Sequence, residues 1–333
     1  MLRYWFLALL AAQAPQQPRF PQLELPKQET PPEPPKPEEP PPKPVLVYEG
    51  KPLKLPFSCT DDDIANFGLT CTADEPCEAY LELAAVEPVA NRLFLTGNLH
   101  TSSVTMWSIL LSSEDSGKTW TEAHERIRST GLEQIQFLDL EAGWIGGEQM
   151  LALPRDPFLL ITKDGGKSWR KKSIHSETRV GAIEQFAFES RTNGVLLVDR
   201  TQTGDSGGRH EYYETSTGGE SWALRQVSPR PIALKRPRIP NPDWRVRADG
   251  PTQSYRIERK PGERWQTVAA FLVSIGECRP TEIKLEPPPE PEEPKLEEVT
   301  LPPGKSRAPP PSLKKKSPNR LPPRSRNEHS RPD

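Results

Sequence analysis

The stretch TKDGGKSW, residues 162–169, decides the fold because the chain repeats it. A close copy, SEDSGKTW, covers residues 113–120, and TSTGGESW at 215–222 has threonine in place of the aspartate. Around residues 260–265 only a glycine, a polar residue and the tryptophan remain. The four tryptophans lie 49, 53 and 43 residues apart, which is the spacing of one four-stranded blade of a β-propeller.

The chemistry of the repeat is that of a turn between two strands. Its aspartate accepts hydrogen bonds from backbone amides a few residues on, and its glycine supplies a positive φ. The serine or threonine hydroxyl closes the loop, and the tryptophan begins the next strand and packs between blades. The residues predicted to have these structural roles are Ser113, Asp115, Gly117 and Trp120; Thr162, Asp164, Gly166 and Trp169; Thr215, Gly219 and Trp222; and Gly262 and Trp265.

Short apolar runs between turn signals fill the intervals, without a useful stretch of helical periodicity, which predicts an all-β domain. The four repeats predict a small β-propeller of four to five blades. The fifth blade requires residues 45–79 and 267–276 to combine. The strand-like runs are 81–86, 92–96 and 106–112 before the first repeat, 132–140, 142–146 and 157–162 before the second, and 183–188, 194–198 and 210–215 before the third.

Proline sets the domain boundaries, since 28 of the 41 prolines lie in residues 15–44 and 280–333. Such segments favour polyproline II and lack the apolar residues that form a core. Residues 1–14, MLRYWFLALLAAQA, resemble a signal peptide with an A-x-A-like cleavage site. An uncleaved anchor and an incorrect start codon are the alternatives. We therefore expect a signal peptide (1–14), a disordered linker (15–44), a propeller (45–279) and a disordered tail (280–333).

Four cysteines, Cys59, Cys71, Cys77 and Cys278, are disulfide candidates in an exported chain. Three connectivities are open, and we expect one bridge within 59–77 and one from that cluster to Cys278. The alternative is four unpaired thiols in a cytosolic chain. Because the spacings do not form C-x2-C pairs, we assign no metal site.

The first two repeats match the Asp-box, S/T-x-D-x-G-x-S/T-W, also called the BNR repeat. The body is loosely similar to the photosystem II assembly/stability factor-like propeller family, most clearly over residues 131–222. Phe137, Asp139, Gly143, Trp144, Gly146 and the second Asp-box carry this resemblance. It implies a largely non-enzymatic propeller that binds other proteins. The proline-rich flanks and the low repeat count depart from the family, so its specific partner does not carry over.

Asp-boxes also occur in sialidases, which makes a sialidase-like glycoside hydrolase the alternative function. Sialidases use three arginines, a Tyr–Glu nucleophile pair and an Arg-Ile-Pro signature before the first Asp-box. Here Arg238-Ile239-Pro240 follows the third box and is interpreted as a loop. Tyr212 and Tyr213 adjoin glutamates, but neighbours in a strand point to opposite faces. We assign no catalytic residue.

Two further motifs are interpreted as loops. Asp61–63, with Asp74 and Glu75, could offer oxygens to calcium but lack the EF-hand pattern, and a solvated acidic loop is favoured. Residues 201–210, TQTGDSGGRH, include a GDSGG motif like that around a trypsin-like serine, but without its context they are predicted to form a hairpin loop.

The tail is acidic and then basic. Residues 281–300 carry seven Glu against two Lys, and residues 301–333 carry nine Lys or Arg against Glu328 and Asp333. We expect weak, salt-sensitive contact of the basic part with anionic surfaces, or a spacer role, and no specific nucleic-acid binding. The function predicted is a non-catalytic, exported (periplasmic or extracellular) binding or assembly propeller without cofactors, whose partner is a protein or envelope polymer.

Overall fold

The computed structural model describes residues 44–203, 209–234 and 241–281. The predicted signal peptide, nearly all of the two proline-rich segments, the Asp205–Gly208 stretch and the Arg-Ile-Pro at 238–240 lie outside these residues. The predictions made for those segments therefore remain predictions.

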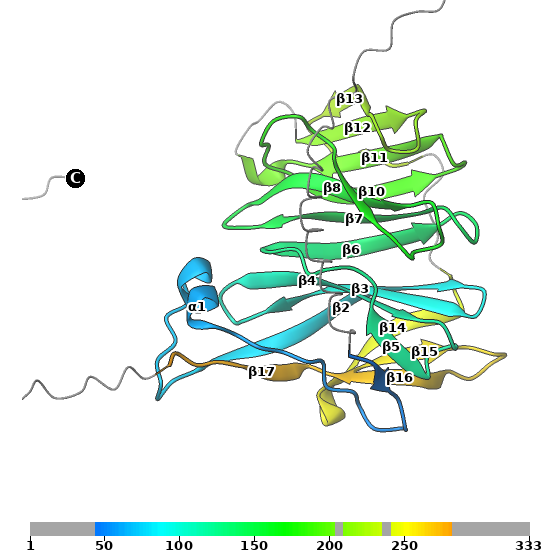
Figure 1. Ribbon diagram of the computed structural model, residues 1–333. Helices are drawn as coiled ribbons and strands as arrows, with labels where there is room; N and C mark the ends of the chain where they lie inside the picture. The colour runs from blue at the N-terminus through cyan, green and yellow to red at the C-terminus, as the bar shows by residue number, and fades with distance from the viewer. Residues whose placement is uncertain (1–43, 204–208, 235–240, 282–333) are drawn as a thin grey trace, which may run out of the picture. The chain divides into compact units, whose positions relative to one another are not determined.

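The described chain folds as a small β-propeller of four antiparallel sheets (Figure 1). The strands follow one another by short turns, and each sheet takes consecutive strands, as the alternating sequence pattern predicts. The first sheet contains β2 (Cys77–Val89), β3 (Arg92–His100), β4 (Thr105–Ser113) and β5 (Thr119–Glu122), the second β6 (Thr130–Phe137), β7 (Gly143–Met150), β8 (Pro154–Thr162) and β9 (Arg170–Ser173), the third β10 (Ala182–Phe188), β11 (Gly194–Asp199), β12 (His210–Thr215) and β13 (Ala223–Ser228), and the fourth β14 (Trp244–Asp249), β15 (Ser254–Arg259) and β16 (Gln266–Leu272).

Two further strands widen the first sheet at both edges. β1 (Leu46–Val47) pairs with β5, and β17 (Ser274–Cys278) pairs with the start of β2. The suggestion that the two ends of the body build a composite fifth blade is therefore wrong for the described residues. Strand β1 covers the open edge of β5, and β17 continues the hydrogen-bonded ladder beyond β2, so each satisfies backbone groups of an existing blade.

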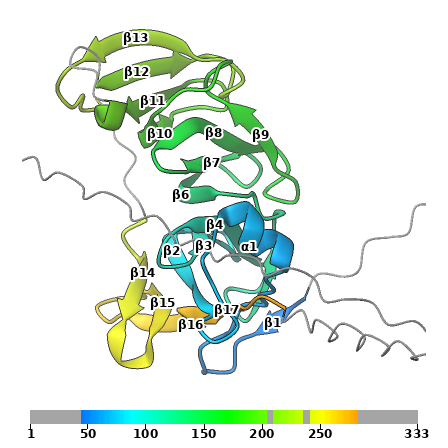
Figure 2. The same cartoon turned by 90° about the vertical axis from the view of Figure 1, so that its left-hand side faces the viewer.

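Adjacent sheets pack in the order fourth, first, second and third (Figure 2). At the innermost strands, side chains bridge one sheet to the backbone of the next. Gln136 of β6 donates to the Phe188 carbonyl of β10 at 2.9 Å and accepts from the Phe188 amide at 2.9 Å. Glu87 of β2 accepts from the Phe137 amide of β6 at 3.1 Å. These contacts satisfy backbone groups at the inner edges of the sheets, where the ladder ends.

The fourth sheet differs from the others in the position of its turn. The first three Asp-boxes connect the third and fourth strands of their sheets, whereas the Gly262 turn connects the second and third strands, β15 and β16. If β15 and β16, which flank this turn, are taken as the third and fourth strands, as in the other sheets, then β14 corresponds to a second strand. Within the residues described, the fourth sheet has no counterpart of the innermost strand, so β14 itself borders the centre.

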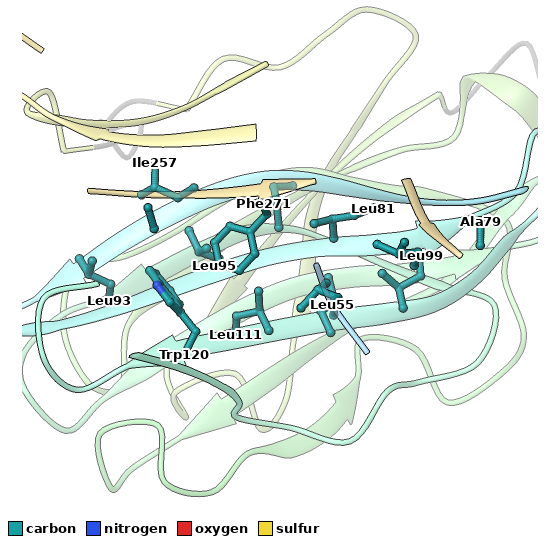
Figure 3. Close-up of a cluster of buried hydrophobic side chains, with 14 residues drawn as sticks. Leu55, Ala79, Leu81, Leu93, Leu95, Leu99, Leu111, Trp120, Ile257 and Phe271 are labelled. Carbon is teal, nitrogen blue, oxygen red and sulfur yellow. The ribbon is translucent and has the colours of Figure 1, made fainter. Parts of the chain in front are cut away.

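The largest apolar core joins the first and fourth sheets (Figure 3). Trp120 is fully buried and meets the ring of Phe271 edge-on, with 5.4 Å between ring centroids. Leu81, Leu95 and Ile257 complete the contact from both sheets. Alternate residues of each strand point into this core, which is why the short alternating runs predict it.

A short helix precedes the first sheet, where the sequence suggested an acidic loop. Helix α1 (Asp61–Phe67) begins at Thr60, whose hydroxyl accepts from the Asp63 amide at 3.2 Å, while the Thr60 amide donates to the Asp63 carboxylate at 2.9 Å. This reciprocal capping box explains the acidic first turn, because carboxylates stabilise the start of a helix. Two single-turn 3-10 helices cover Thr201–Thr203 and Gly250–Thr252.

Both expected disulfides are present. Cys71 pairs with Cys77, and Cys59 pairs with Cys278 across 219 residues of sequence. The second bridge joins the segment before α1 to the end of β17. Among the described helices, none is long and apolar enough to cross a membrane.

Candidate functional site

The aspartates of the first two Asp-boxes bind their own turns. The Asp115 carboxylate accepts from the amides of Lys118 and Thr119 at 3.0 and 2.8 Å and from the Thr119 hydroxyl at 2.7 Å. The Ser113 hydroxyl donates to Asp115 at 2.9 Å and accepts from the Gly117 amide at 2.8 Å. Both carboxylate oxygens therefore have partners within the turn.

The second box repeats this arrangement. Asp164 accepts from the Ser168 amide at 3.0 Å and from the Thr162 hydroxyl at 2.8 Å. These hydrogen bonds favour the ionised form and lower the pKa of Asp115 and of Asp164 to about 2. A carboxylate held in this form is a turn residue and a poor proton donor at neutral pH.

The third and fourth boxes keep the backbone and change the side-chain chemistry. Thr217 replaces the aspartate, and its hydroxyl accepts from the Ser221 amide at 2.9 Å. In the fourth turn Gly262 has φ +112°, close to the +95°, +85° and +91° of Gly117, Gly166 and Gly219. The turn geometry therefore persists where its aspartate has been lost.

The four tryptophans do not share one environment, although the sequence predicts packing between blades for all of them. Trp120 is fully buried, whereas Trp169 and Trp222 are half-buried. Trp265 lies under the Arg245 guanidinium, 4.0 Å from the ring centroid, within its own sheet. The expectation of a large buried ring thus holds fully for Trp120 alone of the four.

A cavity of about 480 Å³, called here the axial cavity, lies where strands β2, β6, β10 and β14 meet. Each strand contributes three residues, and the side chains include two carboxylates, a guanidinium, two amides and an indole. They are Ala84, Ala85 and Val86; Glu133, Gln134 and Ile135; Glu184, Gln185 and Phe186; and Trp244, Arg245 and Val246.

Two acidic groups near this cavity have displaced pKa values. The walls around Glu133 desolvate its carboxyl, and the charge of Glu82 adds to this, so its pKa is raised. Burial, with a smaller contribution from Glu133, raises the pKa of Glu148 to about 8, against the effect of the Ile183 amide that hydrogen-bonds to it. Glu148 is only 2 % exposed and is not among the cavity-lining residues. It is therefore an acid that links β7 to the third sheet rather than one that meets a ligand.

The arginine of the cavity is already paired. Arg245 of β14 donates to Glu258 of β15 at 2.7 Å, and the two residues face each other across the ladder. Arg247 lies 3.8 Å from the same carboxylate. Besides Arg245, the ionisable groups among the cavity-lining residues are Glu133 and Glu184, and Glu184 also lies 3.4 Å from His210 Nδ1.

Strand β12 carries two Tyr–Glu pairs, one on each face. Tyr213 donates to Glu211 at 2.6 Å, and Tyr212 donates to Glu214 at 3.2 Å. Sequence neighbours do lie on opposite faces, and the pairs join residues two apart. Arg179 and Arg200 lie 2.7 and 3.0 Å from Glu211.

The Tyr213–Glu211 pair resembles a sialidase nucleophile in composition, but its environment does not suit that role. The two residues are 4 % and 2 % exposed. Burial, together with the hydrogen bond to Glu211, raises the pKa of Tyr213. A tyrosine nucleophile needs the opposite shift, since the phenolate is the reactive form.

Sequence reasoning missed the axial cavity, although a signal for it exists. LEQIQF at 132–137 and IEQFAF at 183–188 align at one blade interval, which places Glu133 and Gln134 at the positions of Glu184 and Gln185.

The described residues hold no group of three or more His, Cys, Asp or Glu side chains suited to a metal ion.

No protein-family model and no curated protein matches the sequence. Solved structures with some similarity include YCF48 bound to a D1 peptide (16% identity, 59% of this chain and 58% of that one, TM-score 0.33). Others are a GH74 xyloglucanase from Xanthomonas campestris (18% identity, 40% and 18%, TM-score 0.31) and an alpha-L-arabinanase from Penicillium chrysogenum (15% identity, 68% and 66%, TM-score 0.32). The chain thus spans under two thirds of the first two structures. At these identities and TM-scores, neither ligand nor activity transfers to this chain.

Proposed function

We propose that this chain is an exported, non-catalytic binding propeller that holds a protein or envelope component at the axial cavity. The observation that carries the proposal is the meeting of four strands from four sheets around Glu133, Glu184 and Trp244. Recessed polar groups beside an aromatic ring are typical of a binding site. The two carboxylates favour a partner that presents cationic or hydrogen-bond-donating groups.

Two other observations support this function. The Asp-box aspartates bind their own turns, so they supply no chemistry to a substrate. Two disulfides are typical of proteins that fold in an oxidising compartment, which supports export.

The test is capture from envelope extracts by the full chain, compared with the double variant Glu133→Gln/Glu184→Gln. We expect one or a few components to be retained by the native chain and reduced at least five-fold by the double variant. Glu114→Gln/Glu125→Gln is the matched control, since both glutamates are exposed and lie outside the cavity. Equal capture by all three proteins, or no capture, contradicts a binding role for the cavity.

A glycoside hydrolase is the second candidate, and the raised pKa values of Glu133 and Glu148 are the observation that favours it. Glycosidases pair a carboxylic acid of raised pKa with an ionised carboxylate around one bond. The burial of Glu148 counts against it. Turnover of a fluorogenic glycoside by the native chain, abolished in Glu133→Gln, would establish the hydrolase; inactivity across a broad panel would remove it.

A further inference from the structure

The innermost strands of the second and third sheets are joined by glutamine side chains that bond to backbone. Gln134 of β6 donates to the Glu184 carbonyl at 2.8 Å and accepts from the Phe186 amide at 3.4 Å. Gln136 bonds to both backbone groups of Phe188 in the same way. These two glutamines satisfy the inner edge of β10, where no further strand continues the ladder.

The corresponding bond from the third sheet to the fourth is missing. Gln185 occupies the position of Gln134 one blade later, and its side chain has no hydrogen bond to any described residue. Gln185 lines the axial cavity, as do Trp244, Arg245 and Val246 of β14. Because the fourth sheet has no innermost strand within the described chain, Gln185 has no backbone to bond on that side of the cavity.

Strand β14 has a free edge at the same place. An antiparallel strand directs the backbone groups of alternate residues to opposite edges, and β15 pairs with one of these edges over Trp244–Asp249. On the other edge, residues 245–249 form no backbone hydrogen bond with any residue that the structure describes. Arg245 does not block this edge, since its guanidinium lies over the Trp265 ring and bonds to Glu258 of β15.

The segment that leads into β14 is poorly suited to supply the missing strand. Residues 229–242 join β13 to β14 and contain five prolines, which lack the amide that a ladder needs. Ile232 and Leu234 of this segment pack on the third sheet instead. The Asn241 carbonyl accepts from the Trp244 amide at 3.2 Å, so the chain turns directly into β14.

We propose that an extended, proline-free segment of a partner protein adds to the free edge of β14 and takes the place of the missing innermost strand. Its backbone pairs with β14 at one edge and meets the Gln185 side chain at the other. Strand addition recognises the main chain of a partner, and alternate side chains supply selectivity. The proposal rests on the proposed function, since it names the kind of protein segment that the axial cavity holds.

The two faces of β14 predict the side chains of the added strand. Trp244 and Val246 pack against the core between the first and fourth sheets, and Val86 of β2 continues this apolar surface along the cavity. Arg245 lies on the opposite face of the strand. Because residues paired across a ladder point to the same face, the partner segment alternates apolar and polar side chains.

The test uses heptapeptides selected from a random phage-displayed library on the immobilised full chain. We expect the selected peptides to lack proline at their central positions and to alternate apolar and polar residues. With such a peptide at saturation, amide hydrogen exchange in residues 245–249 should slow at least ten-fold. Exchange in β13, an outer strand whose residues do not line the axial cavity, is the internal control and should not change.

Two N-methylated forms of each selected peptide test for pairing through the backbone. One form carries N-methyl groups on the odd-numbered amides, and the other carries them on the even-numbered amides. Only one set of amides faces β14, so one form should bind at least ten-fold more weakly than the other. A peptide held by its side chains alone would lose similar affinity in both forms.

Gln185→Ala tests the second edge of the added strand. This change should weaken binding of the unmodified peptide about three- to ten-fold, which is the effect of one or two hydrogen bonds. Gln226→Ala is the matched control and should bind like the native chain, because Gln226 is an exposed glutamine of β13 outside the axial cavity.

Several outcomes overturn the proposal. They are failure to select any heptapeptide, a bound peptide that leaves exchange in residues 245–249 unchanged, equal binding of the two N-methylated forms, and native affinity in Gln185→Ala. In the free chain, alternate amides of residues 245–249 should exchange rapidly. Slow exchange of all of them would mean that the chain itself covers this edge, which also overturns the proposal.

These results can be told apart from a failure of the proposed function. Capture from envelope extracts that is reduced in Glu133→Gln/Glu184→Gln supports the axial cavity as a binding site, whatever the peptides do. If that capture fails while a heptapeptide slows exchange in residues 245–249, the edge of β14 binds extended polypeptide and the envelope partner is wrong.

Discussion

Gly166 and Phe94 meet at the junction of two sheets: a Cβ on Gly166 would lie 2.6 Å from the Phe94 ring. Gly166 also has φ +85°. A glycine is therefore needed at this position for two reasons: the backbone has a positive φ, and a Cβ would clash with the neighbouring sheet.

Gly166→Ala should lower the free energy of unfolding by about 2–4 kcal/mol, since it adds a clash to the backbone cost of a positive φ. Gly262→Ala is the matched control, with a similar φ and open space, and should cost only about 1 kcal/mol. Urea unfolding of both variants measures the difference. Equal losses would mean that the Phe94 contact has no energetic role.

Asp115→Asn should lower the free energy of unfolding by about 1–3 kcal/mol at pH 7, because charge-assisted hydrogen bonds in the turn are lost. The pKa of Asp115 is lowered from 3.8 to about 2 by these bonds. Its stabilisation is therefore present above about pH 4 and is lost as the pH falls towards 2. Urea unfolding between pH 5 and 2.5 should show a shallower pH dependence for Asp115→Asn. The exposed neighbour Glu114, changed to Gln, should leave the native slope unaltered.

Glu148 should change the pH dependence of stability in the opposite direction. Its pKa is raised to about 8, so the folded chain holds a proton that the unfolded chain releases near pH 4.5. Stability is then highest below about pH 4.5 and falls as the pH rises towards 8. Glu148→Gln should remove this fall and gain about 1–3 kcal/mol at pH 8 relative to the native chain. Glu184→Gln, at an exposed position, is the control; a Glu148 variant with the native pH profile would contradict the assignment.

The two disulfides should differ in their contribution. Removing Cys59–Cys278 as a double serine variant should cost about 4–5 kcal/mol, since the bridge closes a loop of 219 residues. Removing Cys71–Cys77, with a separation of 6, should cost about 2 kcal/mol. Thermal or urea unfolding of the two variants tests this order, and the reverse order would show that native-state contacts outweigh chain entropy.

Local patterns predict the blades well. Strand β12 covers the predicted 210–215, and β10 differs from its predicted range by one residue, because turns and alternation are encoded within a few residues. Strands β14 and β15 carry charge at many positions, since Arg245 and Arg247 pair with Glu258. Strand β14 (WRVRAD) still alternates apolar and charged residues and was missed, whereas β15 (SYRIER) has no such alternation.

Features formed by residues far apart in the sequence could not be predicted from such local patterns. Glu133, Glu184 and Trp244 meet at the axial cavity, although at least fifty residues separate each from the next. The number of blades depended on where β17 pairs: it pairs with the start of β2, although β16 precedes it directly in the sequence. Such choices depend on packing between sheets, which periodicity does not record.

The bond between Cys59 and Cys278 also determines how the body would bear mechanical tension. If the two proline-rich ends were attached to different structures, a pull between them would first act on the fifteen residues 44–58 and the three residues 279–281. Beyond these residues the force would pass directly from the sulfur of Cys59 to that of Cys278. Strands β2 to β17 lie inside the covalent loop, so once β1 has been pulled from β5 they would remain unloaded while the bridge is intact, and reduction of one bond would transfer the force to the blades.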